Sequence, residues 1–299
     1  MHPPPPPRNT VSPPSRNPVF GAVLALVVAN GALAFGPWLV RLADTGPVAS
    51  AFWRIAIATP LLLAVAIGRH RAAILRLPAM LWLTLLVSGV AFAADLAAWH
   101  VGILRTTIAN ATLFGNSASL IFPIYGFVVA RALPARGQAI ALGLALAGGA
   151  LLMGRSAELS PDNLVGDLLC VLAGVLYAVY FIAMSGVRAR LDAVPALALS
   201  GVASVVPLLA FALVLGERIL PGDWTPLILL ALCSQIVGQG LMIYALGHLS
   251  PLVIGIGLLI QPAVGATIGW LAYGERLGAL DLVGAALVAA ALVLVRRER

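Results

Sequence analysis

The chain has 299 residues, of which 61% are hydrophobic and only 10% are charged. An average soluble domain is about a quarter charged and roughly 45–50% apolar. This chain therefore lacks the polar side chains that cover a water-soluble globule, and the same composition excludes disorder for most of its length. The apolar residues run in long blocks and do not alternate with polar ones, which disfavours a β-barrel. The composition predicts an all-α polytopic membrane protein.

The charged residues act as topology signals. All 18 basic residues are Arg, and with 11 acidic residues they give a net charge of +7. Most of them fall in short segments between apolar blocks and form no nucleic-acid-binding patch. Cys170 and Cys233 lie inside apolar blocks, so they predict neither a disulfide framework nor a zinc site.

Residues 1–18 form a Pro-rich polar tail, which we expect to be disordered or to adopt polyproline II. It does not have the pattern of a signal peptide, because the first apolar block begins only at Val19 and no small-residue cleavage site precedes it.

Ten segments after this tail are long and apolar enough to be membrane helices, each of which needs about 20 residues. These predicted spans are 19–40, 47–67, 79–103, 107–130, 137–153, 163–187, 193–215, 225–246, 251–273 and 277–295. They divide the chain into a first five-helix repeat at 19–153 and a second at 163–295, followed by an Arg-rich end at 296–299.

The distribution of Arg predicts that both termini are cytoplasmic. With the N-terminus placed inside, the inside segments hold twelve Arg, the outside segments hold five, and Arg54 lies within a span. Cytoplasmic loops carry an excess of basic residues.

The two halves show internal similarity at an offset of 145 residues. The matched pairs are Gly21 with Gly166, Trp99 with Tyr244, Gly102 with Gly247, Leu104 with Leu249, and Asn116 with Gln261. Five spans per half is an odd number, so the second half must enter the membrane with opposite orientation. Inverted repeats are common in secondary transporters, where the site lies near the midplane between the halves.

Three segments carry a resemblance to a known family: Ala51–Arg54, Leu104–Asn110 before the fourth span, and Tyr273–Leu277 before the tenth. In this order and spacing they resemble the EamA type of the drug/metabolite transporter superfamily, over residues 19–295. Within it, the chain is most similar to bacterial YddG-type exporters of aromatic and other neutral amino acids. The resemblance implies a multi-pass protein of the bacterial inner (plasma) membrane that exports small metabolites by alternating access.

The family closes its fourth and ninth spans with a Gly-Glu signature. The second half has it as Gly274-Glu275, whereas the first half shows Leu133-Pro134 at the matching place. This departure makes a direct transport role for Glu275 doubtful.

Two charged residues inside spans are functional candidates, because burying charge in a membrane is costly. Arg54 and Asp95 lie at a similar predicted depth of roughly 10–12 Å at 1.5 Å per residue. Neighbouring spans would allow them to form an ion pair that acts as a gate or binds a carboxylate. The alternatives are a purely structural pair and an Arg that snorkels to the interface.

Aromatic residues offer a wall for a bulky solute. Trp99 and Tyr244, from matching positions of the two halves, could sandwich an apolar group, or they could belong to an interfacial aromatic belt. His100, beside Trp99, could carry a proton or simply be hydrogen-bonded. Tyr177 and Phe181 share a helix face that lines either a cavity or a core.

Uncharged amides complete the candidate site. Asn116, Gln235, Gln239 and Gln261 lie inside spans and offer donors and acceptors without net charge. They suit a zwitterion or a neutral polar group, although interhelical hydrogen bonding is the competing explanation.

The sequence therefore favours a secondary transporter for neutral or aromatic amino acids, with no cofactor, no metal and no nucleic-acid partner. The nucleophile elbow, the HExxH motif and the Walker loop are absent from the sequence, which disfavours an enzyme. The alternatives are export of another small solute or drug of the same superfamily, an intramembrane enzyme, and a membrane scaffold. Proton coupling, and the choice between monomer and homodimer, stay open.

Overall fold

The computed structural model describes residues 18–157, 161–275 and 278–296, and every regular element in these ranges is a helix. The helices of the first half are α1 (Pro18–Ala34), α2 (Gly36–Leu42), α3 (Pro47–Leu75), α4 (Ala79–Ile103), α5 (Ile108–Gly115), α6 (Ala118–Ala130) and α7 (Arg136–Ala157). Those of the second half are α8 (Pro161–Arg188), α9 (Ala193–Val214), α10 (Thr225–Leu229), η1 (Leu230–Gln239), α11 (Gly240–Leu246), α12 (Pro251–Leu258), α13 (Ile260–Tyr273) and α14 (Ala279–Arg296). The predicted tail at 1–18 and end at 296–299 fall outside the described residues, except for residues 18 and 296.

Eight candidate membrane spans occur in the described part of the chain. They are Val19–Leu42, Pro47–Ala72, Ala79–Ile103, Ile108–Ala130, Asn163–Arg188, Ala193–Val214, Thr225–Leu246 and Pro251–Tyr273. Each overlaps one of the predicted spans, and together they confirm a multi-pass, all-helical protein. The other two predicted spans, 137–153 and 277–295, coincide with helices α7 and α14, and the ten-span count stays a prediction.

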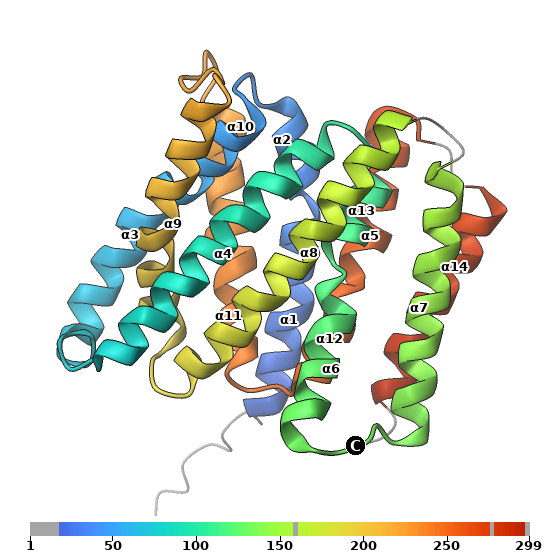
Figure 1. Cartoon of the computed structure of the whole chain (residues 1–299), viewed down its shortest axis with the longest axis horizontal. Coiled ribbons are helices and arrows are strands. Elements are labelled where there is room, and N and C mark those ends of the chain that lie inside the picture. The colour runs from blue at the N-terminus through green and yellow to red at the C-terminus, as the bar shows by residue number, and fades with distance from the viewer. Residues whose placement is uncertain (1–17, 158–160, 276–277, 297–299) are drawn as a thin grey trace, which may run out of the picture.

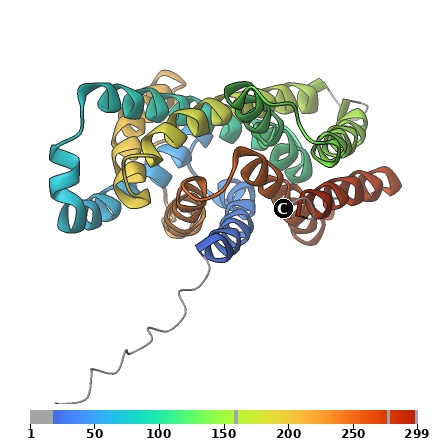
Figure 2. The same ribbon diagram turned by 90° about the horizontal axis from the view of Figure 1, so that it is seen from below.

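The helices run up and down the molecule in alternation, so that α1 begins and α14 ends at the same end of the bundle (Figure 1). Helices α7 and α14 pack against each other to one side of the remaining helices (Figures 1 and 2). We call the end of the bundle where α2 ends and α3 begins the Arg41 end.

Small residues allow α4 to pack closely against α8 and α9. A Cβ added to Gly89 would lie 2.6 Å from the backbone oxygen of Ser200, and one added to Gly102 would lie 2.9 Å from that of Gly166. Ser204 also donates a hydrogen bond of 2.8 Å to the carbonyl oxygen of Gly89. Close backbone approach and interhelical hydrogen bonds hold membrane helices together, because lipid supplies no hydrophobic drive between them.

Two spans are broken near their middle. The span Ile108–Ala130 divides into α5 and α6 at Asn116, and the span Pro251–Tyr273 divides into α12 and α13 at Leu259, two residues before Gln261. Helix α5 packs on α13 and α6 packs on α12, so the two breaks come together. Broken helices are typical of the binding sites of secondary transporters, because freed backbone groups can face a cavity.

The span Thr225–Leu246 departs from regular α-helix over Leu230–Gln239, where η1 is a π-helix. This segment carries Gln235 and Gln239, and its side chains pack on α1 and α3. π-Helical turns are rare and occur frequently at functional sites.

Candidate functional site: a cavity between the two halves

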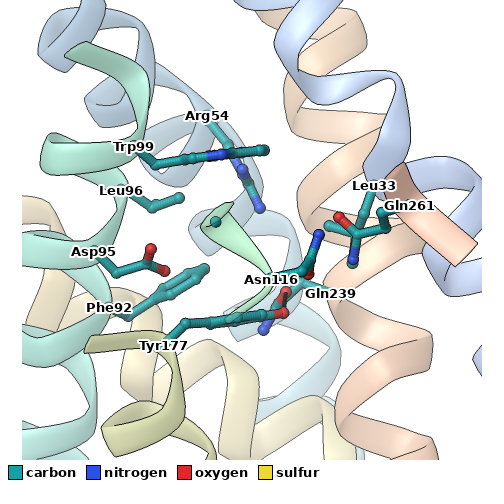
Figure 3. Close-up of a pocket in the computed structure, with 11 residues that line it drawn as sticks. Leu33, Arg54, Phe92, Asp95, Leu96, Trp99, Asn116, Tyr177, Gln239 and Gln261 are labelled. Atoms are coloured by element: carbon teal, nitrogen blue, oxygen red, sulfur yellow. Dashed lines mark hydrogen bonds between the residues drawn. The ribbon is translucent and has the colours of Figure 1, made fainter. Parts of the chain in front are cut away.

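A narrow cavity lies at the centre of the bundle, with a volume of about 30 Å³. This is room for only one or two water molecules. Both halves contribute to its lining, which consists of Leu33, Arg54, Phe92, Asp95, Leu96, Trp99, Gly115, Asn116, Tyr177, Gln239 and Gln261 (Figure 3). The conformation is therefore one in which the side chains close around the space that they share.

Helix α4 presents one face to the cavity. Phe92, Asp95, Leu96 and Trp99 follow the spacing of three and four residues that places side chains on the same side of a helix. The Trp99 ring is fixed by its Nε1, which donates a hydrogen bond of 2.9 Å to the carbonyl oxygen of Ala111. This bond holds the Trp99 ring against α5, the first helix of the broken fourth span.

Arg54 is 1% exposed and reaches the cavity from α3. Its Nε donates a hydrogen bond of 3.2 Å to Oε1 of Gln235, and its guanidinium carbon lies 5.9 Å from the centre of the Phe92 ring. Nη1 is buried and finds no hydrogen-bond partner among the described residues. The Gln235 amide and the face of the Phe92 ring thus hold the buried Arg54 guanidinium, whose Nη1 remains free to donate a hydrogen bond.

Asp95 is 6% exposed and directs its carboxylate into the same cavity (Figure 3). The predicted ion pair with Arg54 is not formed, and within the described ranges no residue donates a hydrogen bond to this carboxylate. The similar depth predicted for the two residues brings them to one cavity. They do not make contact, because the Arg54 side chain extends toward Gln235 on η1.

Tyr177 and the amides form the other walls. The Tyr177 hydroxyl donates a hydrogen bond of 3.0 Å to Oε1 of Gln239, and its ring lies 6.3 Å from that of Phe92 in a stacked arrangement. Within the described chain, Nε2 of Gln239 is buried without a partner. Asn116 and Gln261, which the predicted repeat matches at an offset of 145, both line the cavity.

Four predicted site residues lie outside the cavity lining. Phe181 is fully buried and packs on Tyr177, and Gln235 reaches the site only through its bond to Arg54. The Tyr244 ring lies 4.5 Å from that of His248 near the end of α11, so the predicted sandwich with Trp99 is not formed.

His100 is the fourth of these residues. Its Nδ1 lies 2.9 Å from Oγ of Ser50 and 3.1 Å from the carbonyl oxygen of Pro47, at the start of α3. Its proposed coupling role stays a prediction.

Several lining residues were not predicted from the sequence. Phe92 and Leu96 could have been found from helical spacing, because they share the face of Asp95 and Trp99. Gly115 gave no such signal, and neither did Leu33. Asn30 of α1 does not line the cavity, but its Oδ1 accepts a hydrogen bond of 2.8 Å from Nε2 of Gln261 and so orients that amide.

The Gly-Glu signature lies at the Arg41 end, away from the cavity. Gly274 ends α13 in the left-handed conformation, with φ +63°, and the Glu275 carboxylate accepts hydrogen bonds of 3.1 and 3.2 Å from the backbone N–H of Ile108. Oε1 of Glu275 also lies 3.1 Å from Nη1 of Arg41. Glu275 therefore ties α2 and α13 to the N-terminus of α5, where a negative charge is favourable.

The corresponding place in the first half differs from the sequence expectation. The left-handed residue that ends α6 is Arg131, with φ 49°, so that Arg131-Ala132 takes the place of Gly-Glu, and Leu133-Pro134 follows it. Ala132 offers no carboxylate to the N-terminus of α12. Ser250 caps that helix instead, through its own side chain.

Comparison with known proteins gives a family similarity for the second half of the chain and a shared fold. Residues 164–297 match the model of the EamA-like transporter family. An uncharacterized transporter of Archaeoglobus fulgidus is 24% identical over 285 residues, which cover 93% of this chain and 97% of that protein. A protein of known crystal structure shares the fold, with a TM-score of 0.70 and 15% identity over 95% of this chain and all of its own. Together these findings show that the second half of the chain is similar to the EamA-like transporter family and that the whole chain resembles a transporter and a protein of the same fold.

Proposed function

We propose that the chain is a secondary transporter that exports neutral or aromatic amino acids across the bacterial inner membrane. The observation that carries this proposal is a central cavity lined from both halves by aromatic rings, uncharged amides and one residue of each charge. The direction of transport follows from the resemblance to exporters.

The walls fit a solute with a large apolar side chain. Phe92, Trp99 and Tyr177 present polarizable rings, and aromatic pairs contribute about 0.5–1.5 kcal/mol beyond the area that they bury. Asn116 and Gln261 can donate and accept hydrogen bonds without imposing a net charge. A solute with an uncompensated charge would have to give up its water with little return.

Transport requires that this narrow cavity open toward each side in turn. Breaks at Asn116 and Leu259 lie in the two spans that pack against each other, and they give each span a place to bend. An inverted five-plus-five repeat accounts for the breaks at corresponding places of the two spans. It also accounts for the match between Asn116 and Gln261 in the sequence. In such transporters one half rocks against the other around a fixed site.

The test is uptake of phenylalanine, leucine and alanine into vesicles, normalised to protein level. We expect Trp99→Ala to reduce phenylalanine and leucine transport more than alanine transport, because the cavity loses its largest apolar surface. Tyr244→Ala is the matched control, since its ring lies outside the cavity, and it should keep the wild-type ranking. An unchanged ranking in Trp99→Ala would remove this residue from the site, and no flux of any amino acid would favour another solute of the superfamily.

The contact between Ser50 and His100 bears on the alternative that the protein is an enzyme. Ser50 and His100 are in hydrogen-bond contact at 2.9 Å, as a nucleophile and a base would be. Both are fully buried, however, and lie outside the cavity, and the Ser50 hydroxyl donates to the carbonyl oxygen of Pro47. This pair ties α4 to the first turn of α3.

A further inference from the structure

We propose that the cavity reads both charged poles of a zwitterionic solute, with Arg54 and Gln239 binding its carboxylate and Asp95 binding its ammonium group. This inference rests on the proposed transport function and adds the chemical groups that the site recognises. In this proposal Arg54 and Asp95 each bind the solute and do not form an ion pair with each other.

The carboxylate pole is indicated by two unused donors. Nη1 of Arg54 and Nε2 of Gln239 are both buried, and neither has a partner in the part of the chain that the structure describes. Figure 3 shows Arg54 reaching toward the Asn116 and Gln239 amides. A buried donor without an acceptor costs free energy, and a carboxylate has two oxygens that can accept from both groups, which suits the forked guanidinium of Arg54.

The ammonium pole is indicated by Asp95. Its carboxylate enters the cavity from α4 without an ion-pair partner among the described residues, on a different wall from Arg54. A carboxylate ion accepts hydrogen bonds and donates none. An ammonium group, with three donors and a positive charge, is the matching group.

Charge balance selects the solute class. A solute with only a carboxylate would leave the negative charge of Asp95 uncompensated. A solute with only a cationic group would leave the positive charge of Arg54 uncompensated. Uncompensated charge inside a membrane protein is strongly unfavourable. A zwitterion satisfies both walls at once and carries no net charge across the membrane, while Phe92 and Trp99, on the same α4 face as Asp95, contact its side chain.

The test compares three probes that share one aromatic ring: phenylalanine, its amide (phenylalaninamide), and 3-phenylpropionate. The amide lacks the carboxylate, and 3-phenylpropionate lacks the ammonium group. Equilibrium binding to the purified full-length protein should be about tenfold or more tighter for phenylalanine than for either analogue, as expected for hydrogen bonds to charged groups. This comparison uses the wild-type chain and does not depend on the folding of any variant.

Two variants then assign the poles. Arg54→Gln should abolish the preference over phenylalaninamide but keep the preference over 3-phenylpropionate, and Asp95→Asn should do the reverse. Arg188→Gln is the matched control, because Arg188 is a partly buried Arg that binds the carbonyl oxygen of Ile243 outside the cavity, and it should keep both preferences.

The outcomes separate this inference from the proposed function. Phenylalanine that binds no better than its two analogues would overturn the two-pole site and leave amino-acid transport standing. Absence of both phenylalanine binding and amino-acid flux would overturn both proposals. If the two variants lost both preferences together, Arg54 and Asp95 would act as one unit, and the assignment of separate poles would be wrong.

Discussion

At the residue scale, the position of a residue along its span explains which matched residues reach the cavity. Asn116 and Gln261 lie near the middle of their spans, so the two halves bring them to one cavity even though the spans run in opposite directions. Trp99 and Tyr244 lie near the ends of theirs. Opposite directions place such residues at opposite ends of the bundle, which is why the predicted aromatic sandwich is not formed. Of the two matched pairs, both members line the cavity only at mid-span.

Gly115 tests how tightly the cavity is built. A Cβ at this position would lie 2.6 Å from Nε1 of Trp99, so Gly115→Ala must displace the indole from its bond to the Ala111 carbonyl oxygen. We expect a loss of about 1–3 kcal/mol in the free energy of unfolding, typical of overpacking. Thermal unfolding in detergent and tryptophan fluorescence measure it.

Gly143 is the control for this change. Nothing lies within 4 Å of an added Cβ there, and the residue lies inside helix α7. Gly143→Ala should therefore leave stability unchanged or raise it by up to about 1 kcal/mol, through helix propensity. Equal effects of the two substitutions would show that Gly115 and Trp99 are not in close contact.

At the element scale, hydrophobic blocks predicted where the helices lie but not how they are interrupted. The ranges 107–130 and 251–273 correspond to observed spans, yet each consists of two helices. Close packing lies on both sides of the breaks, such as Gly265 against Thr112 and Gly255 against Ser119, and it forms only when the two spans meet. The π-helix η1 likewise left no composition signal, because its hydrogen-bond pattern is a property of the backbone.

The Gly-Glu motif occurs twice in the structure, with the same geometry. Gly216, with φ +65°, ends α9, and the Glu217 carboxylate accepts hydrogen bonds from the N–H groups of Val48 (3.2 Å) and Ala49 (2.8 Å) at the start of α3. Glu275 caps α5 in the same way. In both cases the Glu at the end of one span fixes the start of another.

We expect Glu275→Gln to destabilise the protein by about 1–3 kcal/mol, because the charge-assisted bonds to Ile108 and Arg41 are weakened. Glu217→Gln should cost less, since this carboxylate caps a helix without an ion pair to any residue that the structure describes. Unfolding midpoints of the two variants give the comparison. The two losses in Arg41→Gln and Glu275→Gln should be non-additive in the double variant, and simple additivity would contradict a functioning ion pair.

At the scale of the whole molecule, composition and Arg distribution predicted a multi-pass helical protein and placed both termini on the same side. The start of α1 and the end of α14 lie at one end of the bundle, as that arrangement requires (Figure 1). We predict that this end faces the cytoplasm.

Tags at the two termini test the orientation. Both should be inaccessible in intact cells and become accessible after the membrane is opened, because the Arg excess favours the cytoplasmic side. Labelling of either terminus on intact cells would reverse the predicted orientation.

In the proposed mechanism, solute crosses the membrane through the cavity between the two halves. Counterflow in proteoliposomes, in which unlabelled phenylalanine inside drives uptake of labelled phenylalanine, measures this directly. Gly115→Leu, which fills the space beside Trp99, should abolish counterflow, whereas Gly143→Leu should retain it at wild-type level. Undiminished counterflow in Gly115→Leu would show that solute does not pass through this cavity.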